Sequence, residues 1–100
     1  MDDKTWDEQL AELTRRFVMG LDTRLEEVER QITLRDWERV ASLAHKLKGA
    51  AASYGFKELA DGAKELETMA RLGHEHLTQP FIEKIVCAIS RSKIMAGLST

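Results

Sequence analysis

The 100-residue sequence predicts an all-α protein, an antiparallel up-and-down four-helix bundle with room for a short or bent extra helix at its N-terminus. Apolar residues recur at spacings of three and four in separate segments, which is the pattern of amphipathic helices. Short polar turns separate these segments, and the chain contains one proline. Helices joined by short turns pack antiparallel to their neighbours. We expect a single domain over residues 1–100, with an ordered core of about residues 5–95.

The first predicted element runs from about residue 5 to residue 32. Thr5 followed by Glu8 resembles a capping box, which satisfies free backbone amides at the start of a helix. Gly20 and Asp22 interrupt the helical pattern, so we expect a bend or a division into two helices there. The apolar stripe of this element consists of Leu10, Leu13, Phe17, Leu21, Leu25, Val28 and Ile32.

The second predicted helix begins at Trp37, after a short polar turn over residues 33–36. Asp36 precedes it and can accept a hydrogen bond from the free backbone amides of the first turn. The helix should end by Gly55, because glycine readily adopts the left-handed conformation that closes a helix. Its expected inward stripe is Trp37, Val40, Ala44, Leu47 and Ala51.

The third predicted helix covers residues 57–72 and ends at Gly73, which again can close a helix. Together with the second helix it should form a tight antiparallel hairpin. Its expected inward stripe is Leu59, Ala63, Leu66 and Ala70.

The last predicted helix begins with Thr78 as its cap and has Pro80 in its first turn, where proline is tolerated. Leu77 is placed to pack against Ile82 as a hydrophobic staple. The helical pattern weakens after about Met95, so we expect a loose terminus there. The expected apolar face of this helix is Ile82, Ile85, Val86 and Ile89.

Composition and charge exclude several classes of function. The net charge of −2 offers no basic field for a phosphate backbone, so nucleic acid is not an expected partner. No segment approaches the roughly 20 apolar residues of a membrane span, and the polar N-terminus does not resemble a secretory signal. We therefore expect a cytoplasmic location without direct membrane contact, either as a separate protein or as a module of a longer, membrane-attached one.

Two further expectations concern burial and assembly. Cys87 is the single cysteine and lies in the run Ile-Val-Cys-Ala-Ile, so we expect a small buried residue in a reducing compartment. One solvated face per helix would leave no second apolar stripe to cover, so a monomer is expected.

His45 is the candidate reactive residue, because it lies off the apolar stripe of its helix. Its neighbours one turn away are Ala41, Lys48 and Gly49, and Ala52 lies two turns on. Glycine inside a helix costs about 1 kcal/mol relative to alanine. Gly49 therefore suggests that a partner, most simply a macromolecule, must approach the imidazole closely.

Glu67 is expected at about the same height as His45, since the two residues lie at similar distances from the turn of the hairpin. A carboxylate that accepts a hydrogen bond from Nδ1 would fix the ring and leave Nε2 as a nucleophile. The alternative is a solvated surface acid that pairs with Lys64 or Arg71. The sequence leaves both interpretations open.

Other candidate chemistry is weaker. His74, Glu75 and His76 could form part of a metal site, but two histidines in a polar loop are not a site, and we assign no metal. Neither Ser42 nor Ser53 lies in a nucleophile elbow. The chain has no glycine-rich nucleotide loop, so we expect neither ATP binding nor kinase activity.

The segment from Ala44 to Gly55, Ala-His-Lys-Leu-Lys-Gly-Ala-Ala-Ala-Ser-Tyr-Gly, resembles the signature of histidine-containing phosphotransfer (HPt) domains. The long first helix, the Asp-Trp turn and the helix from Glu58 to Glu67 extend the resemblance over most of the chain. The resemblance implies a four-helix bundle that carries a phosphoryl group on a histidine between aspartates of receiver domains.

Transferred to this chain, the resemblance makes His45 the phosphorylated residue, Lys48 its charge partner and Gly49 the residue that gives clearance. Tyr54 and Gly55 close the motif. At the position of Glu67 the family often has glutamine or another hydrogen-bonding residue, so an acid departs from the commonest pattern. The expected docking surface is formed by small residues near the histidine, namely Ala41, Ser42, Gly49 and Ala52.

The implied partners are response-regulator receiver domains and a hybrid sensor histidine kinase, of which this chain could be one module. No cofactor is expected on this chain, because the Mg²⁺ of the reaction should be bound by the receiver. The implied activity is that of a phosphocarrier without enzymatic activity of its own.

Two alternatives remain. In one, the small-residue surface accepts a partner helix and the protein is a non-catalytic adaptor. In the other, which we rank last, a metal-dependent activity uses His45, Glu67, His74 and His76.

Overall fold

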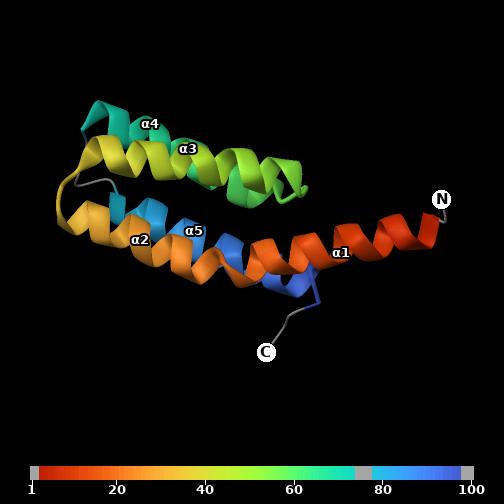
Figure 1. The fold of residues 1–100 in the computed structure, drawn as a ribbon. Coiled ribbons are helices and arrows are strands. Elements are labelled where there is room, and N and C mark those ends of the chain that lie inside the picture. The colour runs from red at the N-terminus through yellow and green to blue at the C-terminus, as the bar shows by residue number, and fades with distance from the viewer. Residues whose placement is uncertain (1–2, 74–77, 98–100) are drawn as a thin grey trace.

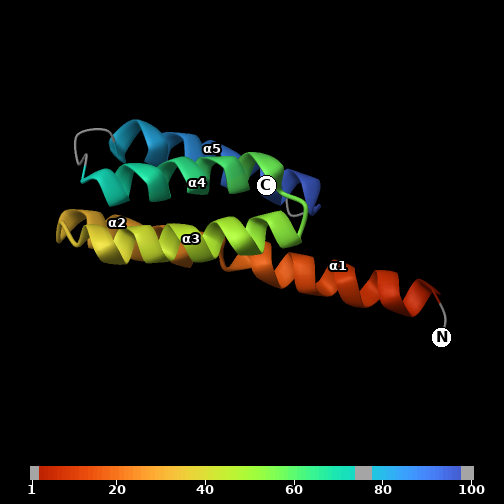
Figure 2. The ribbon, with the colours of Figure 1, turned by 90° about the horizontal axis from the view of Figure 1, so that it is seen from above.

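The computed structural model describes residues 3–73 and 78–97 and confirms the all-α fold class. Its helices are α1 (Asp3–Met19), α2 (Leu21–Thr33), α3 (Trp37–Ser53), α4 (Lys57–Leu72) and α5 (Thr78–Met95). Figure 1 shows α2 to α5 as an up-and-down bundle, with α2 beside α5 and α3 beside α4. Helix α1 continues from α2 and projects beyond the end of the bundle, as both views show (Figures 1 and 2).

The division at Gly20 confirms the expected interruption of the first element. The Gly20 amide donates to the carbonyl oxygens of Arg16 and Phe17 at 3.2 and 3.1 Å, which closes α1, and α2 begins at the next residue. Helix α1 includes Asp3, two residues before the expected start at about Thr5, so the expectation that Thr5 caps the helix is wrong. Thr5 therefore lies within the first turn of the helix and does not precede it.

Local capping positions the α3–α4 hairpin as the sequence predicts. The Arg39 amide donates to the Asp36 side chain at 3.1 Å, so Asp36 caps α3. At the other end Gly55 has a φ of 81°, and the Phe56 amide donates to the Ala51 carbonyl at 2.9 Å. This is the Schellman arrangement, with glycine in the left-handed position. Helix α4 also ends at a glycine in the left-handed conformation, Gly73, with a φ of 72°.

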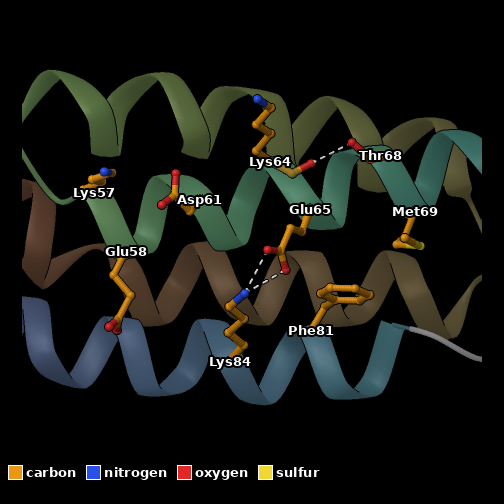
Figure 3. Close-up of a pocket in the computed structure, with 9 residues that line it drawn as sticks. All are labelled: Lys57, Glu58, Asp61, Lys64, Glu65, Thr68, Met69, Phe81 and Lys84. Carbon is orange, nitrogen blue, oxygen red and sulfur yellow. Dashed lines mark hydrogen bonds and ion pairs between the residues drawn. The ribbon is translucent and has the colours of Figure 1, made fainter.

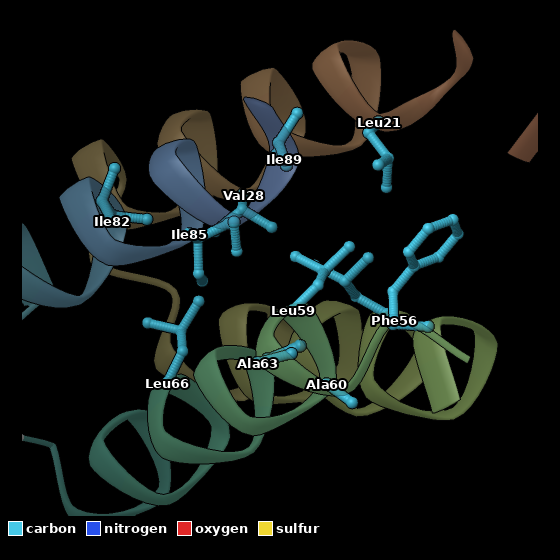
Figure 4. Close-up of a cluster of buried hydrophobic side chains, with 14 of the residues drawn as sticks. Leu21, Val28, Phe56, Leu59, Ala60, Ala63, Leu66, Ile82, Ile85 and Ile89 are labelled. Atoms are coloured by element: carbon cyan, nitrogen blue, oxygen red, sulfur yellow. The ribbon is translucent and has the colours of Figure 1, made fainter. Parts of the chain in front are cut away.

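The core lies between the two helix pairs (Figure 4). An aromatic stack extends it to α1, because the Phe17 ring lies 4.9 Å from the Tyr54 ring and 6.1 Å from the Phe56 ring. Through these contacts, Phe17 packs the last turns of α1 against the turn between α3 and α4. The largest fully buried side chains are Leu21, Leu59, Leu66, Ile85, Val18 and Val40.

The buried face of α5 differs from the prediction. Cys87 and Val86 are exposed, so the expectation that they are buried is wrong. The buried face is centred near Ile85, and it includes Ala88 and Ser92. Cys87 follows Ile85 by two residues, about 200° around the helix, and therefore points away from the core.

Helix α1 has a second unexpected feature. Leu10 and Leu13, together with Trp6, are exposed although they continue the apolar stripe of Phe17. All three belong to α1, and Figure 1 shows the N-terminal part of this helix projecting past the bundle. We expected a monomer because no helix would leave an apolar stripe uncovered. That expectation about apolar stripes is wrong for α1.

Two expectations lie beyond what the structure describes. The staple formed by Leu77 falls in residues 74–77, and the loose terminus falls partly in residues 98–100, all outside the described residues. Within the described part of the chain, no helix combines the length and the apolar character needed to cross a membrane.

Replacing Phe17 with Ala should lower the free energy of unfolding by about 3–5 kcal/mol, because it removes a buried ring that contacts two others. The matched control is Trp6→Ala at an exposed position of the same helix, which should change stability by no more than about 0.5 kcal/mol. Urea unfolding measures both values. Equal effects of the two substitutions would contradict the assignment of Phe17 as the anchor of α1.

Candidate functional site

His45 lies in the middle of α3, and its side chain is 61% exposed. Gly49 follows one turn later on the same face, and a Cβ built there would meet nothing within 4 Å. The protein itself therefore has room for an alanine at this position. The space that Gly49 leaves is open toward solvent, beside the imidazole.

The carboxylate of Glu67 on α4 contacts the His45 ring. His45 Nδ1 lies 3.1 Å from Glu67 Oε2 and 3.3 Å from Oε1, as expected from the equal heights of the two residues. Glu67 is 8% exposed, so it is not the solvated surface acid of the alternative interpretation. The hairpin therefore buries one carboxylate against an exposed imidazole.

Two cations share this carboxylate with the imidazole. Lys48 Nζ lies 3.2 Å from Glu67 Oε1, while Arg71 donates to Oε2 from Nη2 at 2.8 Å and from Nε at 3.1 Å. From the sequence, Arg71 is expected only as a partner of Glu67 in the alternative in which Glu67 is a surface acid. The signal that could have identified it is the spacing of four residues on one helix, which places Glu67 and Arg71 side by side.

These partners determine the charge of Glu67. Hydrogen bonds from Arg71 lower its pKa most, and Lys48 and His45 lower it further, while burial opposes them. The result is a pKa of about 2 instead of 4.5. An ionised carboxylate can only accept hydrogen bonds, so Nδ1 of a neutral His45 must carry the proton. The lone pair is then on Nε2, at the other edge of the ring.

The expected docking residues do not all lie on the surface. Ser42 and Ala52 are exposed near His45, as predicted. Ala41 is 2% exposed and belongs to the core cluster, so the expectation that it lines a docking surface is wrong. On α3, Ala41 and Lys48 both lie on the side of His45 that faces α4, where Ala70 is also buried.

No group of three potential metal ligands occurs among the residues that the structure describes. His74, Glu75 and His76 lie outside those residues, so the structure does not place the four groups of the metal-dependent alternative relative to one another.

A cavity of about 760 Å³ lies between α4 and α5, away from the cluster around His45 that Lys48, Glu67 and Arg71 complete (Figure 3). Met69 and Phe81 form an apolar part of its lining, and Lys84 crosses it to Glu65 at 2.8 Å. Three acidic and three basic side chains line it, so it presents no uniform charge to a ligand. It shares no residue with the cluster around His45.

The sequence matches the Hpt domain family over residues 12–95, and the chain belongs to this family. Hpt domains are phosphocarriers of two-component phosphorelays, where they interact with receiver and kinase partners. The match covers α2 to α5 completely and begins inside α1. No curated protein and no solved structure is significantly similar to the chain.

The low pKa of Glu67 predicts how stability depends on pH. A carboxyl group with a lowered folded-state pKa stabilises the fold above its unfolded pKa of 4.5, and this contribution is lost as pH falls toward 2. The difference in unfolding free energy between the wild type and Glu67→Gln should therefore shrink steadily over that range. Urea unfolding at a series of pH values measures it.

The control for this experiment is Glu58→Gln, because Glu58 forms an ion pair with Arg91 on the surface at 2.6 Å. Exposed pairs of this kind contribute little. The unfolding free energy of Glu58→Gln should therefore differ little from that of the wild type at every pH of the series. If the difference in unfolding free energy between the wild type and Glu67→Gln stayed constant from neutral pH to pH 2, the lowered pKa of Glu67 would be contradicted.

Proposed function

We propose that His45 is the residue that accepts a phosphoryl group from a receiver-domain aspartate and passes it to another receiver. The observation that carries this proposal is the exposed ring whose Nδ1 binds an ionised, buried carboxylate. This arrangement supports Nε2 as the nucleophile. It also supports a fixed ring orientation, which an in-line transfer requires.

In the proposed step the lone pair of Nε2 forms the N–P bond while the O–P bond of the aspartyl phosphate breaks. The aspartate leaves as a carboxylate. Nδ1 keeps its proton, and the ring gains a positive charge that Glu67 stabilises across 3.1 Å. Transfer to the next receiver reverses these changes, so the protein returns to its original state.

Lys48 is proposed to neutralise part of the charge of the phosphoryl group, because it lies three residues from His45 on the adjacent part of the helix surface. Gly49, Ser42 and Ala52 form the docking surface proposed for the receiver. The partner contributes the Mg²⁺ ion and the carboxylates that bind it. The protein would act as a phosphocarrier in the cytoplasm, with receiver domains and a hybrid sensor kinase as partners.

Replacing His45 with Gln should abolish labelling of the protein by a phosphorylated receiver domain, because it removes the nucleophile. Helical content and melting temperature should change little, because the ring is exposed and Lys48 and Arg71 still pair with Glu67. The controls His74→Gln and His76→Gln should keep the label. Labelling that persists in His45→Gln would refute the assignment, and unchanged partner binding and signalling output in that variant would favour the adaptor alternative.

Replacing Gly49 with Ala should separate stability from transfer. The melting temperature should rise by about 4–8 °C, because alanine stabilises a helix by about 1 kcal/mol and nothing in the chain obstructs its Cβ. Transfer from a receiver should slow by about 10- to 100-fold, since a methyl group would displace the partner from in-line geometry.

The control is phosphorylation by phosphoramidate, a small donor that needs no docking surface. Its rate should be the same in the wild type and in Gly49→Ala. Unchanged transfer from the receiver would show that Gly49 gives no clearance to the partner.

A further inference from the structure

Glu67 has more partners than the orientation of one histidine requires. Its Oε1 contacts Lys48 at 3.2 Å, and its Oε2 receives two hydrogen bonds from Arg71, at 2.8 and 3.1 Å. The two cations thus occupy different oxygens of the same carboxylate. Lys48 forms the longer, single contact, and Arg71 forms the shorter, double one.

This arrangement matters for Lys48 because its ammonium group has two uses. In the described structure it pairs with Glu67, but the proposed function requires it beside a phosphoryl group on Nε2. If Lys48 were the sole cation at Glu67, turning toward an incoming phosphoryl group while the His45 ring is still neutral would leave a carboxylate that is 8% exposed without a cationic partner. Leaving a buried charge unpaired is strongly unfavourable.

We propose, on the basis of the proposed function, that Arg71 is a positioning residue that holds Glu67 and thereby frees Lys48 to pair with the phosphoryl group. Arg71 lies one helical turn after Glu67 on α4, so its hydrogen bonds to Glu67 do not depend on α3. Its two donors bind Oε2 whether or not Lys48 occupies Oε1.

Charge balance supports the same assignment. Lys48 and Arg71 together carry two positive charges against the single negative charge of Glu67, so the cluster has one cation more than the carboxylate needs. Removing Arg71 would make Lys48 the required counter-ion of Glu67. The phosphoryl group would then compete with Glu67, which Lys48 already contacts at 3.2 Å, for the same ammonium group.

If Arg71 frees Lys48 in this way, the effects of substituting Arg71 and Lys48 are not additive. Without Arg71, Lys48 stays with Glu67 and contributes little to phosphorylation, so a second substitution at Lys48 has little left to remove. If Arg71 contacted the phosphoryl group independently, the two losses would multiply. A double-mutant cycle distinguishes these cases.

The experiment measures the initial rate at which phosphoramidate phosphorylates the full chain. The Nε2 lone pair forms the N–P bond, the P–N bond of the donor breaks, and ammonia leaves. We expect Arg71→Gln and Lys48→Gln each to slow this rate by about tenfold, the effect of one charge-assisted hydrogen bond. The double variant should be no more than about twofold slower than either single variant.

Two further variants exclude a general structural effect. Arg71→Lys keeps the charge and should recover most of the rate. Arg91→Gln removes an arginine of similar exposure, 64% against 60%, which also pairs with a glutamate, and it should leave the rate unchanged. In addition, Arg71→Gln should raise the pKa of Glu67, as a ¹³C titration of its carboxyl group would show.

Two results would overturn the inference: an unchanged rate in Arg71→Gln, or losses that multiply in the double variant. Failure of the proposed function looks different, because the wild type would then acquire no label that His45→Gln removes. The two failures can therefore be distinguished in one set of measurements.

Discussion

The site depends on the contacts that the buried carboxylate of Glu67 makes with the side chains around it. It joins His45 and Lys48 of α3 to Arg71 of α4, and each of these three side chains is oriented by a contact of 3.2 Å or less to it. Because cations surround it, the carboxylate stays ionised far below neutral pH. This fixes the proton of a neutral His45 on Nδ1. The reactivity proposed for Nε2 follows from that proton.

The backbone of the hairpin makes this contact possible. Gly55 closes α3 in the left-handed conformation, and α4 begins two residues later, which sets the register of the two helices. A shift of one residue in α4 would rotate Glu67 by about 100° away from the imidazole. The stack of Phe17 on Tyr54 adds a contact from α1 to the same turn. Features far from His45 therefore determine the geometry at its ring.

Much of this structure was predictable because it depends on local sequence. The bounds of α4, the Asp36 cap and the break at Gly20 follow from capping residues and glycine. The meeting of His45 with Glu67 was predictable from two helices of equal rise on either side of one turn. The small residues around His45 and the family resemblance pointed to the same position, and the family match confirms the class of protein.

The errors concern which part of a helix surface a neighbour covers. Ala41 shares the face of His45 in projection, but α4 packs over it. Cys87 lies in an apolar run, yet the core contacts the opposite side of α5. Leu10 continues the apolar stripe of α1, yet it is exposed because no other helix covers it. The importance of the Arg71 contact was not predictable for the same reason. It depends on how deeply α3 and α4 bury the carboxylate of Glu67.

The most direct test of the central claim is ¹⁵N NMR of the His45 ring, in the neutral unphosphorylated protein and after phosphorylation. We expect the proton on Nδ1 before the reaction, and a phosphorus coupling to Nε2 with the proton still on Nδ1 afterwards. A ring protonated on Nε2 before the reaction, or a phosphoryl group attached to Nδ1, would contradict the role assigned to Glu67.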